Sequence, residues 1–195
     1  MREALIIFVR NPLLGKVKTR IARTMGDEKA LEIYHVLLKH THDITFPLAV
    51  DSFVFYADII NLNDQWENDR YQKYLQQGSD LGEKMENAFS TVFNLGYASV
   101  CIIGSDCLEL SRNELESAFE TLETNDIVIG PSTDGGYYLL GMNSMESVLF
   151  ENKPWSSDEV LDKTIADIKA SELRYSLLPT LTDIDNEQDW LNSAI

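Results

Sequence analysis

A cluster of basic residues near the start of the chain has the composition of a phosphate-binding loop. No Asp or Glu occurs between residues 4 and 26, although the whole chain has a net charge of −16. The basic side chains of this stretch are Arg10, Lys16, Lys18, Arg20 and Arg23. Lysine and arginine supply the charge that binds a phosphate, and a glycine such as Gly15 lets backbone amides come close to it. We therefore predict an anion site here, against the alternative of a solvated basic loop that balances acidic neighbours.

Two known phosphate-binding motifs do not fit this loop. In a Walker A loop, the first glycine would fall at Arg10, and Val17 would stand where Ser or Thr holds magnesium. The dinucleotide fingerprint Gly-x-Gly-x-x-Gly is absent from the sequence. The prediction therefore depends on the basic side chains and on Gly15, and not on either motif.

Asp106 is the first candidate for a metal ligand. It ends the sequence Gly104-Ser105-Asp106, directly after an apolar run that predicts a buried strand. A carboxylate in this place suits Mg²⁺ or Mn²⁺, which takes one or two protein carboxylates and completes its shell with phosphate oxygens and water. The competing interpretation is an aspartate that caps a helix or a turn. Asp185, or Asp183 in its place, is predicted as the second ligand, although both could merely cap the terminal helix.

A later turn is predicted to face the acceptor. Asp134-Gly135-Gly136-Tyr137 joins two predicted strands, and its glycines permit a positive φ or a close approach of the backbone to a ligand. An ordinary hairpin turn of the Asp-Gly type is the competing interpretation. Trp155 stands just before a helix cap, where an aromatic ring could act as a lid or stack on a ligand. We predict acceptor binding by Gly135, Gly136, Tyr137 and Trp155, with Asp134 as a base.

Other kinds of chemistry find little support. His35, His40 and His42 show no spacing to a carboxylate or thiol that indicates a metal site or a triad, and Gly-x-Ser-x-Gly is absent. Cys101 and Cys107 are too few for a disulfide framework, and they favour a reducing cytoplasm. The net charge of −16 argues against a nucleic-acid polymer or an anionic membrane as the partner.

The candidate residues lie on a pattern of alternating strands and helices. Apolar runs predict strands at 5–9, 52–57, 99–103, 126–130, 137–142 and 175–178, with a short element at 71–75. Apolar residues at helical spacing and capping signals predict helices at 27–42, 81–93, 112–122 and 160–168, and a short acidic helix from 187. This alternation predicts an α/β, three-layer Rossmann-like fold with a mostly parallel sheet. Ligands bind such a sheet at the carboxyl ends of its strands, where these candidates fall.

The same pattern favours one compact unit. No repeat, low-complexity tract or linker interrupts it, so we predict a single domain over 1–195. The longest apolar runs, 5–9 and 100–103, are far too short to span a bilayer. The first residues lack the pattern of a signal peptide, in line with the cytoplasm.

Several motifs in a fixed order resemble a known family. They are Arg10-Asn11-Pro12 with Gly15-Lys16-Val17-Lys18-Thr19-Arg20, Gly78-Ser79-Asp80-Leu81-Gly82-Glu83, Ile103-Gly104-Ser105-Asp106, and Gly130-Pro131 with Asp134-Gly135-Gly136-Tyr137-Tyr138. Trp155-Ser156-Ser157-Asp158 and Asp183-Ile184-Asp185 follow the same pattern. Together they resemble the GT-A-like transferase family named for genes beside radical-SAM and selenodomain proteins, which carries an arsenosugar-biosynthesis label. This family is related to the phospholactate guanylyltransferases.

The resemblance implies the nucleotide-diphospho-sugar transferase fold of GT-A type. It would place Gly15, Lys16 and Arg20 near the nucleotide. Asp106 would stand at the position of the metal-binding aspartate of the superfamily, and Asp185 at that of a second. The sequence departs from the family pattern in that Leu108 replaces a usual proline and Lys84 an arginine.

We expect a metal-dependent transferase that uses a nucleotide-activated donor, Mg²⁺ or Mn²⁺ and a small-molecule acceptor. Glycosyl transfer from a nucleotide-sugar is the first hypothesis. The nucleotide-binding residues would be Arg10, Gly15, Lys16, Lys18, Arg20 and Ser105, and Asp106 would be catalytic through its metal. The alternative is a nucleotidyltransferase that releases pyrophosphate, because the basic loop suits pyrophosphate equally well. A nucleotide-binding domain without turnover is the second alternative.

Overall fold

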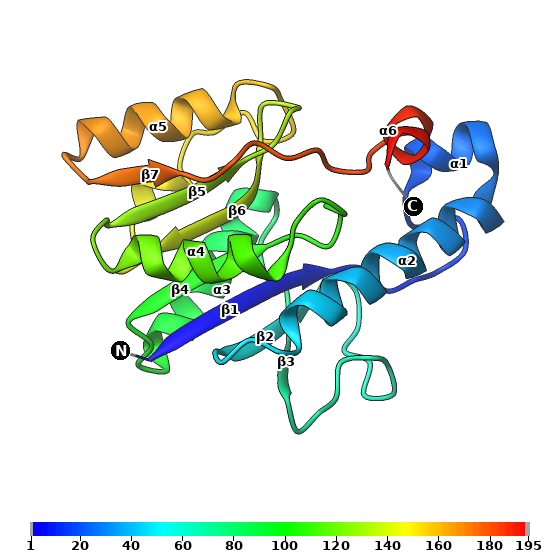
Figure 1. Ribbon diagram of the computed structural model, residues 1–195, viewed down its shortest axis with the longest axis horizontal. Coiled ribbons are helices and arrows are strands. Elements are labelled where there is room, and N and C mark those ends of the chain that lie inside the picture. Colours follow the sequence, from blue (N-terminus) through cyan, green and yellow to red (C-terminus); the bar gives the residue numbers. More distant parts are fainter. Residues whose placement is uncertain (1, 194–195) are drawn as a thin grey trace.

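A seven-stranded sheet forms the centre of the computed structural model, which describes residues 2–193. Its strand order is β3-β2-β1-β4-β6-β5-β7 (Figure 1). The strands are β1 (Glu3–Val9), β2 (Asp51–Tyr56), β3 (Tyr71–Leu75), β4 (Ser99–Ile103), β5 (Ile127–Pro131), β6 (Tyr137–Met142) and β7 (Tyr175–Leu177). Strand β6 runs antiparallel to β4 and β5, and the other neighbouring strands are parallel. The predicted mostly parallel sheet is confirmed.

Helices connect most of the strands. They are α1 (Thr19–Met25), α2 (Asp27–Thr45), α3 (Leu81–Asn94), α4 (Arg112–Leu122), α5 (Val160–Ala170) and α6 (Glu187–Asn192), with a 3₁₀ turn, η1 (Ser147–Leu149). The sequence predicted every α-helix except α1. Ile21 is the one buried residue of α1, so the helix has no apolar stripe to detect. Gly26, with a φ of 87°, separates α1 from α2.

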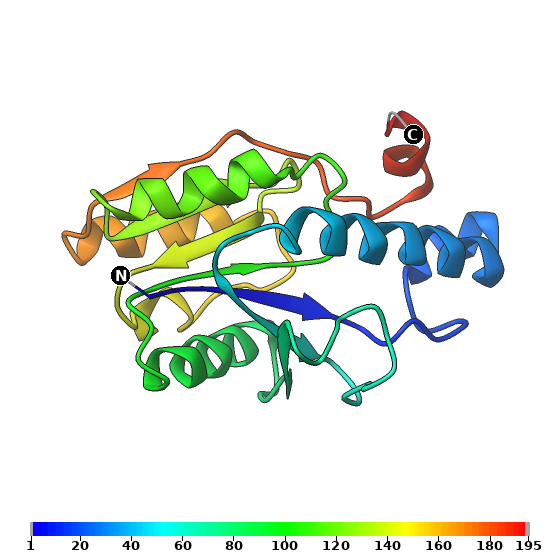
Figure 2. The same cartoon turned by 60° about the horizontal axis from the view of Figure 1, so that its bottom comes forward.

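Two apolar cores cover the two faces of the sheet. Alternate residues of β1 enter different cores, as the period of a strand requires. Leu5 and Ile7 pack in the core that includes α2 and α4, whereas Ala4 and Ile6 pack in the core that includes α3 and α5. Figure 2 shows α2 and α4 on one side of the strands and α3 on the other. The three-layer arrangement is therefore confirmed.

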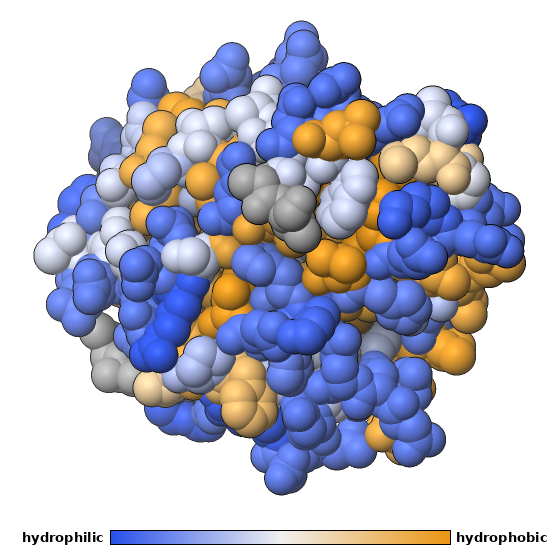
Figure 3. Space-filling view, turned by 45° about the vertical axis from the view of Figure 1, so that its right-hand side comes forward, coloured by the Kyte–Doolittle hydropathy of each residue, from blue (hydrophilic) through white to orange (hydrophobic). Residues whose placement is uncertain are grey.

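One edge of the sheet gathers the segments that carry the candidate residues. Strand pairing aligns the end of β1 with that of β4, and the start of β6 lies beside the end of β5. Helices α1 and α6, from the two ends of the sequence, contact each other beyond this edge (Figure 1). The side that Figure 3 turns forward is mainly hydrophilic, with scattered apolar side chains. No helix in the described part of the chain has the length and apolarity needed to cross a membrane.

Candidate functional site

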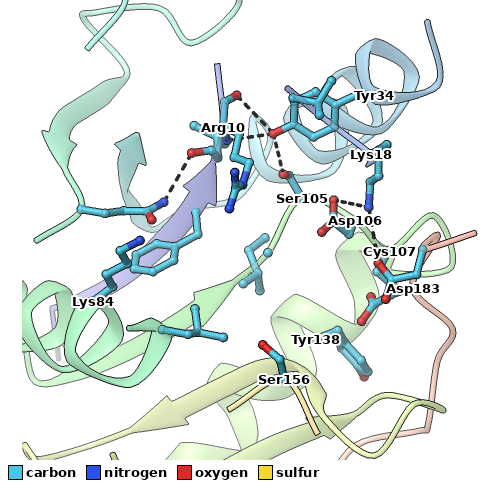
Figure 4. Close-up of a pocket in the computed structure, with 18 of the residues that line it drawn as sticks. Arg10, Lys18, Tyr34, Lys84, Ser105, Asp106, Cys107, Tyr138, Ser156 and Asp183 are labelled. Carbon is cyan, nitrogen blue, oxygen red and sulfur yellow. Dashed lines mark hydrogen bonds and ion pairs between the residues drawn. The ribbon is translucent and has the colours of Figure 1, made fainter. Parts of the chain in front are cut away.

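A cavity of 640 Å³ opens where β1 and β4 end (Figure 4). The loop before α1, the start of α3, the start of β6 and the segment before α6 complete its wall. Eight predicted site residues line it: Arg10, Lys16, Lys18, Arg20, Ser105, Asp106, Tyr137 and Asp185. The basic loop and the candidate metal ligands therefore open into one space.

Side chains from elsewhere fix the start of the basic loop. The backbone amide of Arg10 donates to the hydroxyl of Tyr34 at 2.8 Å, and that hydroxyl donates to the Arg10 carbonyl at 3.2 Å. Burial, with the charge of Asp106, raises the pKa of Tyr34 to about 12, so it remains a donor at neutral pH. The side-chain amide of Asn11 bonds both the carbonyl and the N–H of Ile59. The end of β1 is thus held in one position.

Gly15 shapes the loop and does not line the cavity. Its φ is +70°, a left-handed conformation that glycine adopts without steric cost. A Cβ at this position would lie 3.3 Å from a carboxylate oxygen of Asp27, in addition to the backbone strain. The amide of Lys16 closes the turn by donating to the Leu13 carbonyl at 3.0 Å. Gly15 therefore places Lys16, and the prediction that it contacts the nucleotide stays a prediction.

Lys18 makes unexpected contacts for a residue predicted to bind phosphate. Its ammonium donates to Oδ1 of Asp106 at 2.8 Å and to the carbonyl of Ile184 at 2.7 Å, and it lies 3.8 Å from Oδ1 of Asp185. The side chain is only 7% exposed. The backbone of Lys18 is left-handed, with a φ of 46°. Strain of this kind costs roughly 1 kcal/mol and is retained where surrounding contacts determine it.

The cavity has a cationic side and an anionic side. Arg10, Lys16 and Lys84 form no ion pair with any residue among 2–193. In Figure 4, Arg10 and Lys84 lie across the cavity from Asp106 and Asp183. Arg10 comes from the end of β1 and Lys84 from the first turns of α3. Arg10 and Lys84 on this wall, and Lys16 elsewhere in the lining, are therefore available to bind an anion.

The anionic side is built by a segment that crosses the edge of the sheet. The amide of Ile184 donates to the backbone carbonyl of Asp106 at 2.8 Å, which places Asp183 and Asp185 beside it. Burial, together with the charge of Asp106, raises the pKa of Asp183 to about 7. Burial also raises the pKa of Asp185, although the ammonium of Lys18 opposes this shift. Three carboxylates therefore share this end of the cavity.

The hydroxyl of Ser132 links Asp183 to the next turn. It lies 2.7 Å from Oδ1 of Asp134 and 3.0 Å from Oδ2 of Asp183. A hydroxyl has one proton and can donate to one carboxylate at a time. Donation by Ser132 favours the ionised form of Asp183 and opposes part of the rise in pKa that burial causes.

The predicted acceptor residues are mostly placed away from the cavity. Asp134 accepts a hydrogen bond from the amide of Gly136 at 2.9 Å and closes its own turn. A Cβ on Gly135 would lie 2.2 Å from the carbonyl oxygen of Asp158, so this glycine permits close packing of the chain before α5. Of the predicted acceptor set, only Tyr137 lines the cavity, and within residues 2–193 its buried hydroxyl makes no hydrogen bond.

Trp155 packs against the start of α3. A Cβ on Gly82 would lie 2.3 Å from its ring nitrogen, so the indole rests directly on the glycine backbone. Neither residue lines the cavity, although Ser156, the next residue along, does. This contact joins the segment before α5 to α3 and leaves the proposed stacking role of Trp155 as a prediction.

Several lining residues were not among the predicted site residues. They include Tyr34, Gln76, Lys84, Tyr138 and Ser156. The side-chain nitrogen of Gln76 donates to the carbonyls of Phe55 at 3.0 Å and Val9 at 3.4 Å, and no group within residues 2–193 donates to its side-chain oxygen. Lys84 directly follows the motif that ends at Glu83, so the motif is a signal that could have indicated it. Gln76 follows a strand that the sequence predicts only weakly, and no pattern marks it.

A family model described as an uncharacterized protein conserved in bacteria (DUF2064) matches residues 47–157. The chain belongs to the DUF2064 family. The DUF2064 protein is also similar to a structure from Desulfovibrio desulfuricans G20 that is provisionally described as a nucleotide-diphospho-sugar transferase. The two sequences are 30% identical, the match covers 97% of this chain and 85% of the other, and the TM-score is 0.89.

More distant structures share the fold of the DUF2064 protein. An inositol-1-phosphate CTP transferase from T. maritima is 16% identical, with 97% of this chain and 91% of the other covered and a TM-score of 0.58. A Mycobacterium tuberculosis protein in complex with manganese is 9% identical, with coverage of 98% and 97% and a TM-score of 0.59. At such identities the likeness extends to the fold alone. No curated protein matches the sequence.

The residues of the DUF2064 protein fit a divalent cation that a substrate helps to hold. Within residues 2–193, no group of three or more His, Cys, Asp or Glu side chains is arranged to hold a metal by itself. Mg²⁺ and Mn²⁺ need only one or two protein carboxylates when phosphates and water complete the shell. Asp106 and Asp185 already approach the same cation, the ammonium of Lys18. The oxygen donors of these two carboxylates suit a hard cation.

Proposed function

We propose that this protein is a metal-dependent glycosyltransferase that uses a nucleotide-sugar donor. The observation that carries the proposal is a single cavity with the unpaired cations Arg10 and Lys84 on one wall and carboxylates on the other. A nucleoside diphosphate with a divalent cation needs both walls, because its phosphates bind Lys and Arg while its metal binds carboxylates. The volume, 640 Å³, is in the usual range for a small-molecule site, about 300–1,000 Å³.

The chain's own residues would bind and orient the diphosphate. Arg10, Lys16 and Arg20 supply positive charge to its oxygens, and the Ser105 hydroxyl lies beside Asp106 at the cavity wall. Asp106 and Asp185 would hold the metal, which neutralises charge on the departing diphosphate when bound. Positive groups fixed in advance around that charge lower the barrier without rearranging during the reaction. A role for Asp134 as base stays a prediction, since its carboxylate already closes a turn.

Nucleotidyl transfer with release of pyrophosphate is the second candidate. The fold is shared with a CTP transferase, and the same unpaired cations would bind pyrophosphate. Analysis of products separates the two reactions. Release of a nucleoside diphosphate supports sugar transfer, whereas release of pyrophosphate supports nucleotidyl transfer.

A thermal-shift panel of nucleotides and nucleotide-sugars with Mg²⁺ and Mn²⁺ tests the proposal. A ligand at one hundred times its dissociation constant adds about 2.7 kcal/mol of stability, an easily measured shift. We expect Lys16→Met to lose most of the shift. Lys29→Met is the matched control, because Lys29 lies on α2, pairs with Glu32 and does not line the cavity. No shift with any nucleotide, or equal shifts in both variants, would contradict the proposal.

The same test examines a nucleotide-binding role without turnover. In that case Asp106→Ala would leave both nucleotide affinity and any activity unchanged, with metal present or absent. Within the DUF2064 family, we further propose that the chain groups with the GT-A-like transferases associated with radical-SAM and selenodomain genes. We propose a cytoplasmic location, which the two buried, unpaired cysteines support.

A further inference from the structure

The ammonium of Lys18 occupies the position where two candidate metal ligands converge. It donates to Oδ1 of Asp106 at 2.8 Å and lies 3.8 Å from Oδ1 of Asp185. The Ile184 carbonyl, at 2.7 Å, holds it in place. The Lys18 side chain is 7% exposed, whereas the side chains of Asp106 and Asp185 are 44% and 38% exposed.

The charges around this position are unbalanced. Two carboxylates, those of Asp106 and Asp185, share one buried cation, Lys18. The nearest other cation, Arg20, is 67% exposed and reaches Oδ2 of Asp185 only at 3.4 Å. The pair therefore leaves negative charge uncompensated, and 44% of the Asp106 side chain is open to the cavity.

We infer that Lys18 is a resident cation that competes with the divalent metal for Asp106 and Asp185. The inference rests on the proposed function, because it assumes that these two carboxylates are metal ligands. Lys18 holds them together before substrate arrives and must release Asp106 when a metal binds there. The phosphates of a donor give the released ammonium a new partner in the same cavity.

Electrostatics requires this competition. An ammonium and a divalent ion that share a carboxylate oxygen would stand only a few ångströms apart, where like charges repel strongly at low solvent exposure. The oxygen of Asp106 that accepts from Lys18 cannot serve both cations fully. Without a nucleotide, the protein should therefore bind the metal less tightly than the same carboxylates would in the absence of the Lys18 ammonium.

Titration with Mn²⁺ alone, followed by the electron paramagnetic resonance signal of free Mn²⁺, measures the competition. We expect Lys18→Met to bind Mn²⁺ about tenfold more tightly than the wild type, because it removes one positive charge beside the ligands. Lys73→Met is the matched control. Lys73 is equally buried and also donates to one carboxylate, Asp64, and to one carbonyl, that of Asn61, but it does not line the cavity. Its Mn²⁺ affinity should equal that of the wild type. Unchanged or weaker binding by Lys18→Met overturns the inference, as does equal tightening in both variants.

Acetylation of the wild type tests the inference without a substitution. Lys18 should resist a small acylating reagent in the absence of metal and react at saturating Mg²⁺, as mass spectrometry of its peptide would show. Lys73 should resist in both conditions, since its ion pair is outside the cavity. Equal protection of Lys18 with and without Mg²⁺ overturns the inference.

These experiments separate the inference from the proposed function. Both use the metal alone, so a protein that binds no nucleotide can still give the expected result at Lys18. Conversely, a protein that binds nucleotides with metal but shows no change at Lys18 retains the proposed function and refutes the competition.

Discussion

Lys18 and Lys73 make nearly identical contacts and serve different parts of the molecule. Each is buried, at 7% and 5% exposure, and each donates to one aspartate at 2.8 Å and to one backbone carbonyl. Their partners differ. Asp64 also accepts hydrogen bonds from the Tyr56 hydroxyl at 2.6 Å and from the Trp66 amide at 3.2 Å. Asp106 has two further carboxylates as neighbours and opens into the cavity.

The difference separates a structural ion pair from one that can exchange partners. The oxygens of Asp64 have their donors within the fold, so its pair with Lys73 fixes the loop between β2 and β3. The pair of Lys18 with Asp106 lies in a region of excess negative charge with access to ligands. A buried salt bridge on its own indicates neither stability nor function. The other groups that contact the carboxylate decide whether the ion pair is fixed or can exchange partners.

The largest expected effect concerns turnover, followed as release of nucleoside diphosphate or pyrophosphate. Asp106→Asn should lower the rate by about 1,000-fold, since it weakens a metal that is worth several kcal/mol to the transition state. Asp64→Asn should leave the rate per folded molecule within about threefold. Comparable losses in the two variants would remove the functional distinction between the pairs.

The free energy of unfolding should be affected in the opposite order, more by Asp64→Asn than by Asp106→Asn. Asp64→Asn leaves Lys73 buried without its counter-charge and should lower the free energy of unfolding by about 3–5 kcal/mol. Asp106→Asn should cost less, because the carboxylate of Asp185 remains near Lys18 and both aspartates are partly exposed to water. Urea unfolding of both variants in a metal chelator provides the measurement. A larger loss for Asp106→Asn would contradict the comparison.

The pH dependence of stability tests the raised pKa of Asp183 on the anionic side of the cavity. The pKa of Asp183 is about 7 in the folded protein and near 3.8 when unfolded, so the folded state binds the proton more tightly. Between these values the free energy of unfolding should fall as pH rises, and above about pH 8 this contribution should level off. Asp183→Asn should flatten the curve in that window without metal. An unaltered slope would show that burial does not raise the pKa of Asp183 in the folded protein.

The smallest expected effect is the coupling between nucleotide and metal. In the wild type, nucleoside diphosphate should tighten Mn²⁺ binding by about tenfold more than in Lys18→Met, because it offers the displaced ammonium a partner. The Lys73→Met variant should keep the wild-type coupling. Calorimetric titration of Mn²⁺ with and without nucleotide measures the factor.

The sequence predicts where the main parts of the site lie, because each part follows the end of a predicted strand. Apolar runs before Arg10 and before Asp106 indicate parallel strands, and such strands end at one edge. This reasoning places the basic loop and the carboxylate together without any knowledge of contacts. It also predicts Asp183 and Asp185 near that edge, since they follow the last strand.

The contacts inside the site could not be predicted in the same way. The partner of Lys18 depends on a left-handed backbone at a non-glycine residue, which no local pattern indicates. The sequence predicts a ligand contact at Gly135 because a glycine permits close approach, and in the structure the approaching group is the backbone of Asp158. Sequence shows that space is needed at such positions, but not what fills it.

The most direct test is a crystal soaked with Mn²⁺ and the nucleoside diphosphate that gives the largest thermal shift. The account predicts an anomalous peak bonded to a carboxylate oxygen of Asp106 and to the diphosphate, with Arg10 and Lys16 on the phosphates and the Lys18 ammonium withdrawn. Mn²⁺ bound away from Asp106, or a nucleotide outside the cavity, would contradict it.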